Sequence, residues 1–219
     1  GGIYLQEARI SWRNSSCLDN LSLQDGGCLF ARNFVRGTVF ELLAENNLCF
    51  GSGGGIALRN FNQIDFLACK LSGNRALNGA GLFVSGTSFS SFEAGIISNN
   101  NAISSGGGVL IKEHAEPRIS NTLISYNHAD STGGGMKVSD NAQPVLSHLL
   151  VTENSSPNEG GGISFSDSSV AILSDSLILK NSVNATGGGL VFSISTHGTL
   201  TNVVIQNNFA KSKGGGIAF

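Results

Sequence analysis

Charge is scarce in this sequence. Charged residues make up 13% of the 219 residues, and the formal net charge is −2. The lysines and arginines do not cluster, so we expect binding to neither nucleic acid nor anionic lipid. Long apolar runs are missing as well. Residues 181–210 carry no charge, but glycine, asparagine, serine and threonine interrupt them, so we expect neither a membrane-inserted segment nor a signal peptide.

Helical periodicity is also absent, whereas glycine is abundant, with 30 residues. Many of the glycines belong to a recurring motif such as Gly106-Gly107-Gly108-Val109-Leu110-Ile111. The last glycines of successive copies recur at intervals of about 27 residues, and the last five intervals are identical. These markers are Gly2, Gly27, Gly55, Gly81, Gly108, Gly135, Gly162, Gly189 and Gly216. A repeat of this length predicts a solenoid, in which each repeat buries its apolar face against its neighbours.

Apolar residues keep fixed places within each repeat. The first and third residues after the marker are apolar, as at Val109 and Ile111, and a spacing of two predicts a strand with one buried face. Two further apolar columns stand eleven and sixteen residues after the marker; Leu43 and Ile124 are members of the second. An asparagine follows that column three residues later in seven consecutive repeats, at Asn46, Asn74, Asn100, Asn127, Asn154, Asn181 and Asn208.

A ladder of stacked side chains would explain the asparagine column. In coils about 4.8 Å apart, each amide can donate to and accept from its neighbours. We therefore predict an all-β fold, a right-handed parallel β-helix of about eight coils of about 27 residues, with three short strands per coil and an internal asparagine ladder. We expect residues 1–219 to be one segment of a longer solenoid, with irregular cysteine-containing coils in residues 1–80 and regular coils in residues 81–219.

The repeat also resembles a known family. The step from Ile124 to Asn127 is followed by the small residue Ala129 and then by Gly-Gly-x-apolar, and the step from Ile178 to Asn181 is of the same kind. These steps resemble the repeats of polymorphic outer membrane proteins, which are autotransporter passenger domains of chlamydiae, and of similar large secreted proteins of algae and protists. The usual steps of that family are Phe-x-x-Asn and Gly-Gly-Ala-Ile, whereas no step here begins with phenylalanine. The resemblance implies a β-helix outside the cell or at its surface.

All four cysteines lie in residues 1–80: Cys17, Cys28, Cys49 and Cys69. Their confinement to one part of the chain fits a disulfide in a secreted protein, and the alternative is that they are buried small apolar residues, which suits the inward position of Cys28. Four N-x-S/T sequons fit glycosylation of a secreted protein, at Asn14, Asn20, Asn154 and Asn184. Because Asn154 belongs to the ladder, we expect it to be buried and unmodified.

Three carboxylates share one place in consecutive repeats: Glu113, Asp140 and Asp167. They would lie about 5 Å apart, a spacing that suits a retaining glycosidase pair or a calcium site. Their place is just past a strand, where polar residues commonly form turns, so we favour a solvated turn. The four histidines occupy four different places in the repeat: His114, His128, His148 and His197. We expect no catalytic residue, no metal site and no cofactor.

A column of large aliphatic residues stands one residue before the buried column: Leu42, Ile96, Leu123, Leu150, Leu177 and Val204. Strand alternation would point these side chains outward as an exposed stripe, whereas a bend just before them would turn them toward the core. The first alternative favours a non-enzymatic extracellular rod, structural or adhesive, that contacts other protein chains, further domains of the same protein, or glycans. The second function considered is a carbohydrate-active β-helix enzyme, which would need charged residues to converge on one face.

Overall fold

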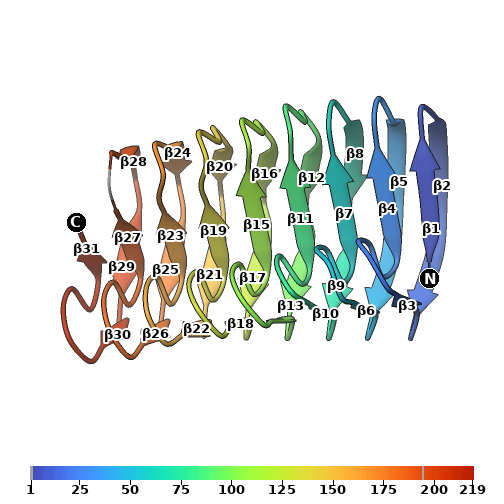
Figure 1. The fold of residues 1–219 in the computed structure, drawn as a ribbon. Coiled ribbons are helices and arrows are strands. Elements are labelled where there is room, and N and C mark those ends of the chain that lie inside the picture. Colours follow the sequence, from blue (N-terminus) through green and yellow to red (C-terminus); the bar gives the residue numbers. More distant parts are fainter. Residues whose placement is uncertain (1, 194) are drawn as a thin grey trace.

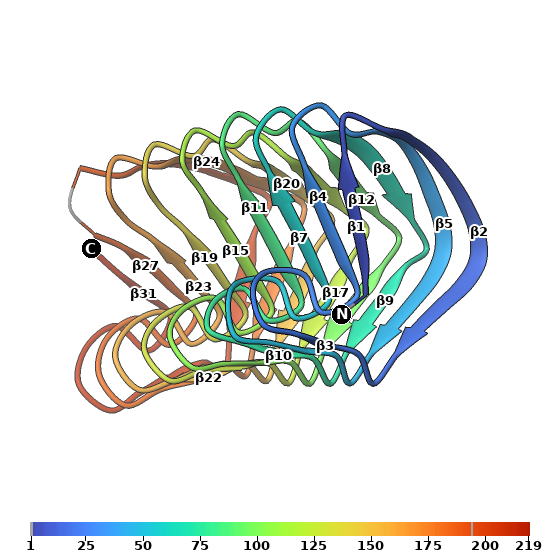
Figure 2. The same ribbon diagram turned by 45° about the vertical axis from the view of Figure 1, so that its right-hand side comes forward.

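The computed structural model describes residues 2–193 and 195–219, and within them the chain winds into stacked coils of parallel strands. The coils lie side by side, with the two ends of the chain at opposite ends of the stack (Figure 1). Each coil passes through three sheets. In Figure 2, the short strands of one of them, labelled β3, β10 and β22, lie along the rounded loops at the lower side of the stack. The prediction of a parallel β-helix with three sheets is confirmed. In this part of the chain, no helix is long and apolar enough to cross a membrane.

The first sheet has nine strands, and every neighbouring pair is parallel. In the middle of the sheet, inward side chains such as Val109 and Ile111 are fully buried. The strands are β1 Ile3–Gln6, β4 Leu29–Arg32, β7 Ile56–Arg59, β11 Leu82–Ser85, β15 Val109–Lys112, β19 Met136–Val138, β23 Ile163–Phe165, β27 Leu190–Phe192 and β31 Ile217–Ala218.

The second sheet has 14 strands and two arms, which are joined through the long strands β2 Arg9–Leu18 and β5 Arg36–Glu45. The first arm continues as β8 Gln63–Leu67, β12 Ser91–Glu93, β16 Arg118–Ser120, β20 Val145–Ser147, β24 Val170–Ser174 and β28 His197–Thr201. The second arm continues as β9 Lys70–Ser72, β13 Ile96–Ser98, β17 Leu123–Ser125, β21 Leu150–Thr152, β25 Leu177–Leu179 and β29 Val204–Gln206.

The third sheet has eight short strands. Its inward residues are small and, with Ala80, enclose a minor core separate from the main one. The strands are β3 Leu21–Ser22, β6 Leu48–Cys49, β10 Arg75–Ala76, β14 Asn101–Ala102, β18 His128–Ala129, β22 Ser155–Ser156, β26 Ser182–Val183 and β30 Phe209–Ala210.

Sharp corners separate these strands, and each corner uses a residue with positive φ. Between the arms of the second sheet it is Asn121 (49°) in one coil and His148 (52°) in the next. Before the third sheet it is Tyr126 (55°), and before the first sheet it is Gly133 (67°). A left-handed conformation costs a residue with a Cβ roughly 1–2 kcal/mol, so other interactions must hold these corners.

The asparagine ladder supplies those interactions at the corner before the third sheet. The side-chain amide of Asn127 donates to Asn154 Oδ1 (3.0 Å) and to the carbonyl of Ile97 (2.9 Å), and its backbone N–H also donates to Asn154 Oδ1 (2.9 Å). Asn127 Oδ1 accepts the two matching bonds from Asn100. The ladder comprises Asn20, Asn47, Asn74, Asn100, Asn127, Asn154, Asn181 and Asn208. The predicted buried ladder is confirmed.

The register expected for the second coil is wrong by one residue. Strand pairing aligns Leu29 with Ile56, so Cys28, and not Gly27, stands where Gly55 stands in the next coil. Cysteine occupies the position of the last glycine in that motif. A marker defined as the last glycine is therefore placed one residue too early in this coil. The interval from Gly27 to the next marker was one residue too long for this reason.

Three expectations fail because of this single slip. The ladder contains Asn47, which is fully buried, whereas Asn46 is exposed and forms the preceding corner with a φ of 55°. The buried column contains Ala44 in place of Leu43. Leu42 is 1% exposed and faces the core, so it does not belong to the outward stripe, and Leu43 takes that position beside Lys70.

The first three coils are less irregular than their glycines suggest. In the first sheet, the steps from Ile3 to Leu29 and from Ile56 to Leu82 are each one residue shorter than the step from Leu29 to Ile56. The first missing residue falls at the corner after β1, where Glu7 and Ala8 correspond to residues 33–35. The second falls in the loop after β10, because Arg75 pairs with Leu48 at a separation of 27 residues and Asn78 pairs with Ser52 at a separation of 26. Length therefore varies at the corners and not within the sheets.

Candidate functional site

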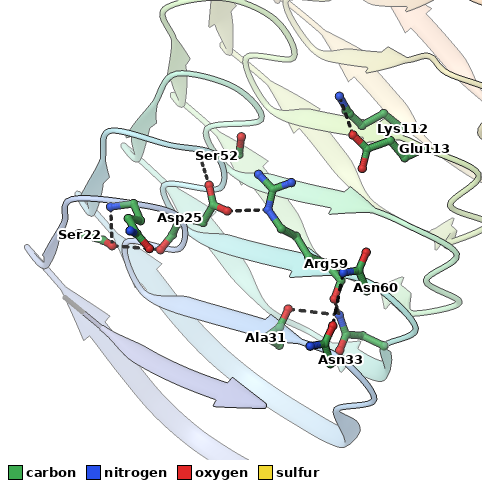
Figure 3. A network of polar contacts seen from close by, with 11 residues as sticks. Ser22, Asp25, Ala31, Asn33, Ser52, Arg59, Asn60, Lys112 and Glu113 are labelled. Atoms are coloured by element: carbon green, nitrogen blue, oxygen red, sulfur yellow. Dashed lines mark hydrogen bonds and ion pairs between the residues drawn. The ribbon is translucent and has the colours of Figure 1, made fainter. Parts of the chain in front are cut away.

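The three carboxylates expected in one row lie in the corner after the first sheet. Glu113, Asp140 and Asp167 have positive φ values of 57°, 53° and 54°. Lys112 Nζ is 2.9 Å from Glu113 Oε1 and 3.4 Å from Asp140 Oδ2, and the Lys112–Glu113 pair is drawn in Figure 3. The hydrogen bond with Glu113 raises the pKa of Lys112. Glu113 and Asp140 therefore share an ion pair with Lys112 in the turn, whereas Asp167 accepts a hydrogen bond from Ser166 Oγ (2.7 Å).

The disulfide joins Cys17 to Cys28, whose Cα atoms are 5.5 Å apart. Cys17 stands in the inward column of the second arm, and Cys28 stands at the last glycine position of its motif, so the bond crosses the interior of the coil. Cys49 and Cys69 are buried and free. Burial, and next the negative charge of Asp25, raises the pKa of the Cys49 thiol to about 12.

A polar cluster with no counterpart among the sequence-based expectations holds the N-terminal loops together (Figure 3). Asp25 Oδ1 accepts a hydrogen bond from the backbone N–H of Ser52 (2.7 Å), and its other oxygen pairs with Nε of Arg59. The guanidinium of Arg59 lies 4.6 Å from the ring centroid of Phe83. The cluster ties the loop after β3 to the outer face of the first sheet. We therefore assign it a structural role.

The sequons fall in two kinds of place. Asn14 and Asn184 are exposed. Asn154 is fully buried in the ladder, as expected. Asn20 is half-buried and is the first member of the ladder, where its side-chain nitrogen donates to Asn47 Oδ1 at 3.0 Å. A glycan on Asn20 would occupy the nitrogen that makes this bond.

The outward column of the second arm is apolar over five coils, and we call it the apolar stripe: Ile96, Leu123, Leu150, Leu177 and Val204. Ile96, Leu177 and Val204 are 39%, 42% and 49% exposed, and the other two are half-buried. Alternation with the buried Ile97 column turns the stripe outward. Lys70 ends the stripe at the third coil, with its Nζ 4.0 Å from Glu45 Oε1.

An open trough of about 540 Å³ lies on the outer face of the third sheet. His128 and Asp130 stand at one end, Ser155 and Ser182 line the middle, and Phe209 stands beyond them in β30. His128 Nδ1 is 2.8 Å from Ser155 Oγ, and His128 Nε2 is 3.1 Å from Asp130 Oδ1. The four histidines do not stack on one another, and this contact joins a histidine to a serine. The separation of 27 residues between His128 and Ser155, one full repeat, is the signal that could have shown it.

A metal centre has no support in the described part of the chain. There, no three side chains of histidine, cysteine, aspartate or glutamate gather as a metal ion requires.

Comparison with known proteins places the chain in a fold family. A family model described as right-handed beta helix region matches residues 54–219, which is well over half of the chain. The chain therefore belongs to the right-handed β-helix family, and the predicted handedness is confirmed. No curated protein and no solved structure matched the chain. The resemblance to polymorphic outer membrane protein repeats rests on the sequence steps alone.

Proposed function

We propose that this chain is a structural or adhesive rod outside the cell or at its surface, and that it acts by packing its apolar stripe against a second copy of itself. The observation that carries the proposal is the stripe. Five large aliphatic side chains stand outward in consecutive coils, and water contacts each of them. Association would recover about 25 cal/mol for each Å² of apolar surface removed from water.

The spacing of the stripe favours a second copy as the partner. Its side chains recur once per coil, at about 4.8 Å, because the coils are neighbouring strands of a parallel sheet. The stripe of another copy has the same pitch, so the side chains of two antiparallel or parallel rods can interdigitate along the length of the stripe. A globular partner would match this pitch only locally.

Charge does not oppose such packing. None of the five stripe residues is charged, and the net charge of the chain is only −2. Lys70, at the end of the stripe, has Glu45 beside it. The contact itself needs no catalytic step, and the disulfide between Cys17 and Cys28 supports an oxidising compartment.

Sedimentation equilibrium of the full chain tests the proposal. We expect the parent protein to exceed its monomer mass of 22.7 kDa as the concentration rises, and Leu150→Asp/Leu177→Asp to remain at that mass. A matched control is Ser147→Asp/Ser174→Asp, which adds the same charge to the same two coils on the first arm of the second sheet. The control should associate as the parent does. A folded Leu150→Asp/Leu177→Asp variant that associates like the parent would refute the proposal.

A further inference from the structure

A chain of two hydrogen bonds at one end of the trough resembles the parts of a nucleophilic site. His128 bridges a hydroxyl and a carboxylate, with Nδ1 at 2.8 Å from Ser155 Oγ and Nε2 at 3.1 Å from Asp130 Oδ1. A nucleophile within hydrogen-bond reach of a base, which a third group in turn orients, is the general signature of an activated serine. Geometry identifies such a set, whatever the order of its members in the chain.

The fold explains why these three residues meet. His128 and Ser155 are the outward residues of the paired strands β18 and β22, one coil apart, while Ala129 and Ser156 face inward. Asp130 follows two residues after His128, where the chain leaves the sheet. The neighbours of His128 in the sheet are Asn101 and Ser155, both uncharged, and Asp130 is the carboxylate that contacts the ring.

We propose that Ser155 is a nucleophile for acyl transfer from small carboxylic esters, with His128 as its general base and Asp130 as the residue that positions the imidazole. With the proton on Nε2, the ring donates to Asp130, and the free lone pair of Nδ1 accepts the hydroxyl proton of Ser155. The proposal goes beyond the lateral packing of the rod, uses a different sheet, and departs from the expectation that the chain has no catalytic residue.

The trough offers a place for the ester. At about 540 Å³ it falls within the size range of small-molecule sites. Phe209 is 60% exposed at the far end and offers an apolar surface to the alcohol part of the ester. Asn184 lines the same trough and brings a side-chain amide, a donor of the kind that stabilises a developing oxyanion.

The reaction balances with water as the only co-reactant. Ser155 Oγ attacks the ester carbonyl carbon while its proton passes to His128 Nδ1. The tetrahedral intermediate collapses, the bond from carbon to the alcohol oxygen breaks, and Nδ1 returns the proton to the leaving alcohol. Water then attacks the acyl-serine by the same proton route, and the carboxylic acid and the free serine are released.

Ser182 is a matched control within the trough. It occupies the place of Ser155 one coil later and lines the same trough, but its neighbours in the sheet are Ser155 and Phe209, with no histidine beside it. General-base assistance contributes typically 10²–10⁴-fold to a rate. Ser155 should therefore react at least about 100-fold faster than Ser182.

Labelling of the full chain with a fluorophosphonate probe, read out by peptide mass spectrometry, tests the proposal. We expect phosphonylation of Ser155 in the parent protein, loss of this label in Ser155→Ala, and a fall of about 100-fold in His128→Gln. Ser147→Ala, on the first arm of the second sheet and outside the trough, should label like the parent. Circular dichroism melting curves verify that each variant is folded.

Asp130→Asn separates positioning from structure. We expect labelling of Ser155 to fall in a folded Asp130→Asn variant and to be restored in Asp130→Glu, which returns a carboxylate beside the imidazole. Absence of label on Ser155, equal labelling of Ser155 and Ser182, or an unchanged rate in a folded His128→Gln variant would each overturn the proposal. None of these outcomes bears on association through the apolar stripe.

Discussion

The first three coils and the five that follow share one cross-section but are held together differently. The early coils contain a disulfide through the interior, an ion pair between Asp25 and Arg59 and two repeats that are each one residue shorter than the others. The later coils keep a constant repeat length and rely on stacked apolar columns and the asparagine ladder. Local devices such as the disulfide therefore accompany variable corners, whereas the ladder runs through both regions.

The ladder should show the largest difference between the two regions. Asn127→Leu would remove the two hydrogen bonds that Asn127 accepts from Asn100 and the one that its side chain donates to the carbonyl of Ile97, at roughly 1–3 kcal/mol each and so about 3–9 kcal/mol in total. Asn20→Leu removes only the side-chain bond to Asn47, so we expect a loss of about 1 kcal/mol. Urea unfolding measures both. Equal losses would mean that the ladder does not couple the coils.

The disulfide should come next. In the chain-entropy model, a loop of 11 residues stabilises the fold by about 3 kcal/mol. The free energy of unfolding of Cys17→Ala/Cys28→Ala should therefore be lower by that amount, and its urea midpoint should fall. Reductant should bring the parent protein down to the same midpoint and leave the double variant unchanged. If reductant also destabilised the double variant, the effect would not belong to this bond.

The middle position of the glycine motif gives a smaller contrast. A Cβ on Gly107 would overlap the backbone carbonyl oxygens of Gly134 and His128, so Gly107→Ala should cost about 1–3 kcal/mol. The third coil already has Ala80 at this position, in a repeat that is one residue shorter, so Ala80→Gly should cost about 1 kcal/mol or less. Thermal melting of the two variants compares them. An equal cost would show that corner length does not decide whether a Cβ fits.

The smallest effect is expected from alkylation of the free thiols of the early coils, Cys49 and Cys69. Burial raises the pKa of Cys69 and, together with Asp25, that of Cys49 to about 12, so both stay neutral in the folded protein at pH 8. We expect iodoacetamide to leave them unmodified until urea unfolds the chain. An unfolded thiol ionises at lower pH than a folded one, so their contribution to stability is complete at neutral pH and declines above about pH 9. Rapid alkylation of native Cys49 would contradict the buried position.

The architecture could be predicted from the sequence because the stacking of the coils causes its periodicity. Side chains that stack once per coil must recur once per repeat, so the constant interval and the asparagine column were sufficient for the fold. The second coil was misaligned because Cys28 fills a glycine position that a search for glycine cannot identify. Without that alignment, the approach of Cys28 to Cys17 could not be predicted.

Side-chain contacts between different coils were harder to predict from the sequence. The contact of Asp25 with Arg59 depends on a loop path, and the loop lengths of the early coils differ by single residues. The contact of His128 with Ser155 follows from the repeat, but only if unlike residues one coil apart are compared. The outward direction of the stripe could not be decided from the sequence either. It depends on whether the chain continues as a regular strand through the stripe residue or bends just before it.

Disulfide trapping tests the proposed lateral packing most directly. Leu150→Cys places a thiol in the apolar stripe, and Ser147→Cys places one at a half-buried site in the same coil on the first arm. The native cysteines do not interfere, because two are bonded to each other and two are buried. After mild oxidation, non-reducing gels should show a covalent dimer for Leu150→Cys and a monomer for Ser147→Cys. Equal cross-linking of both variants, or none in Leu150→Cys, would contradict packing through the stripe.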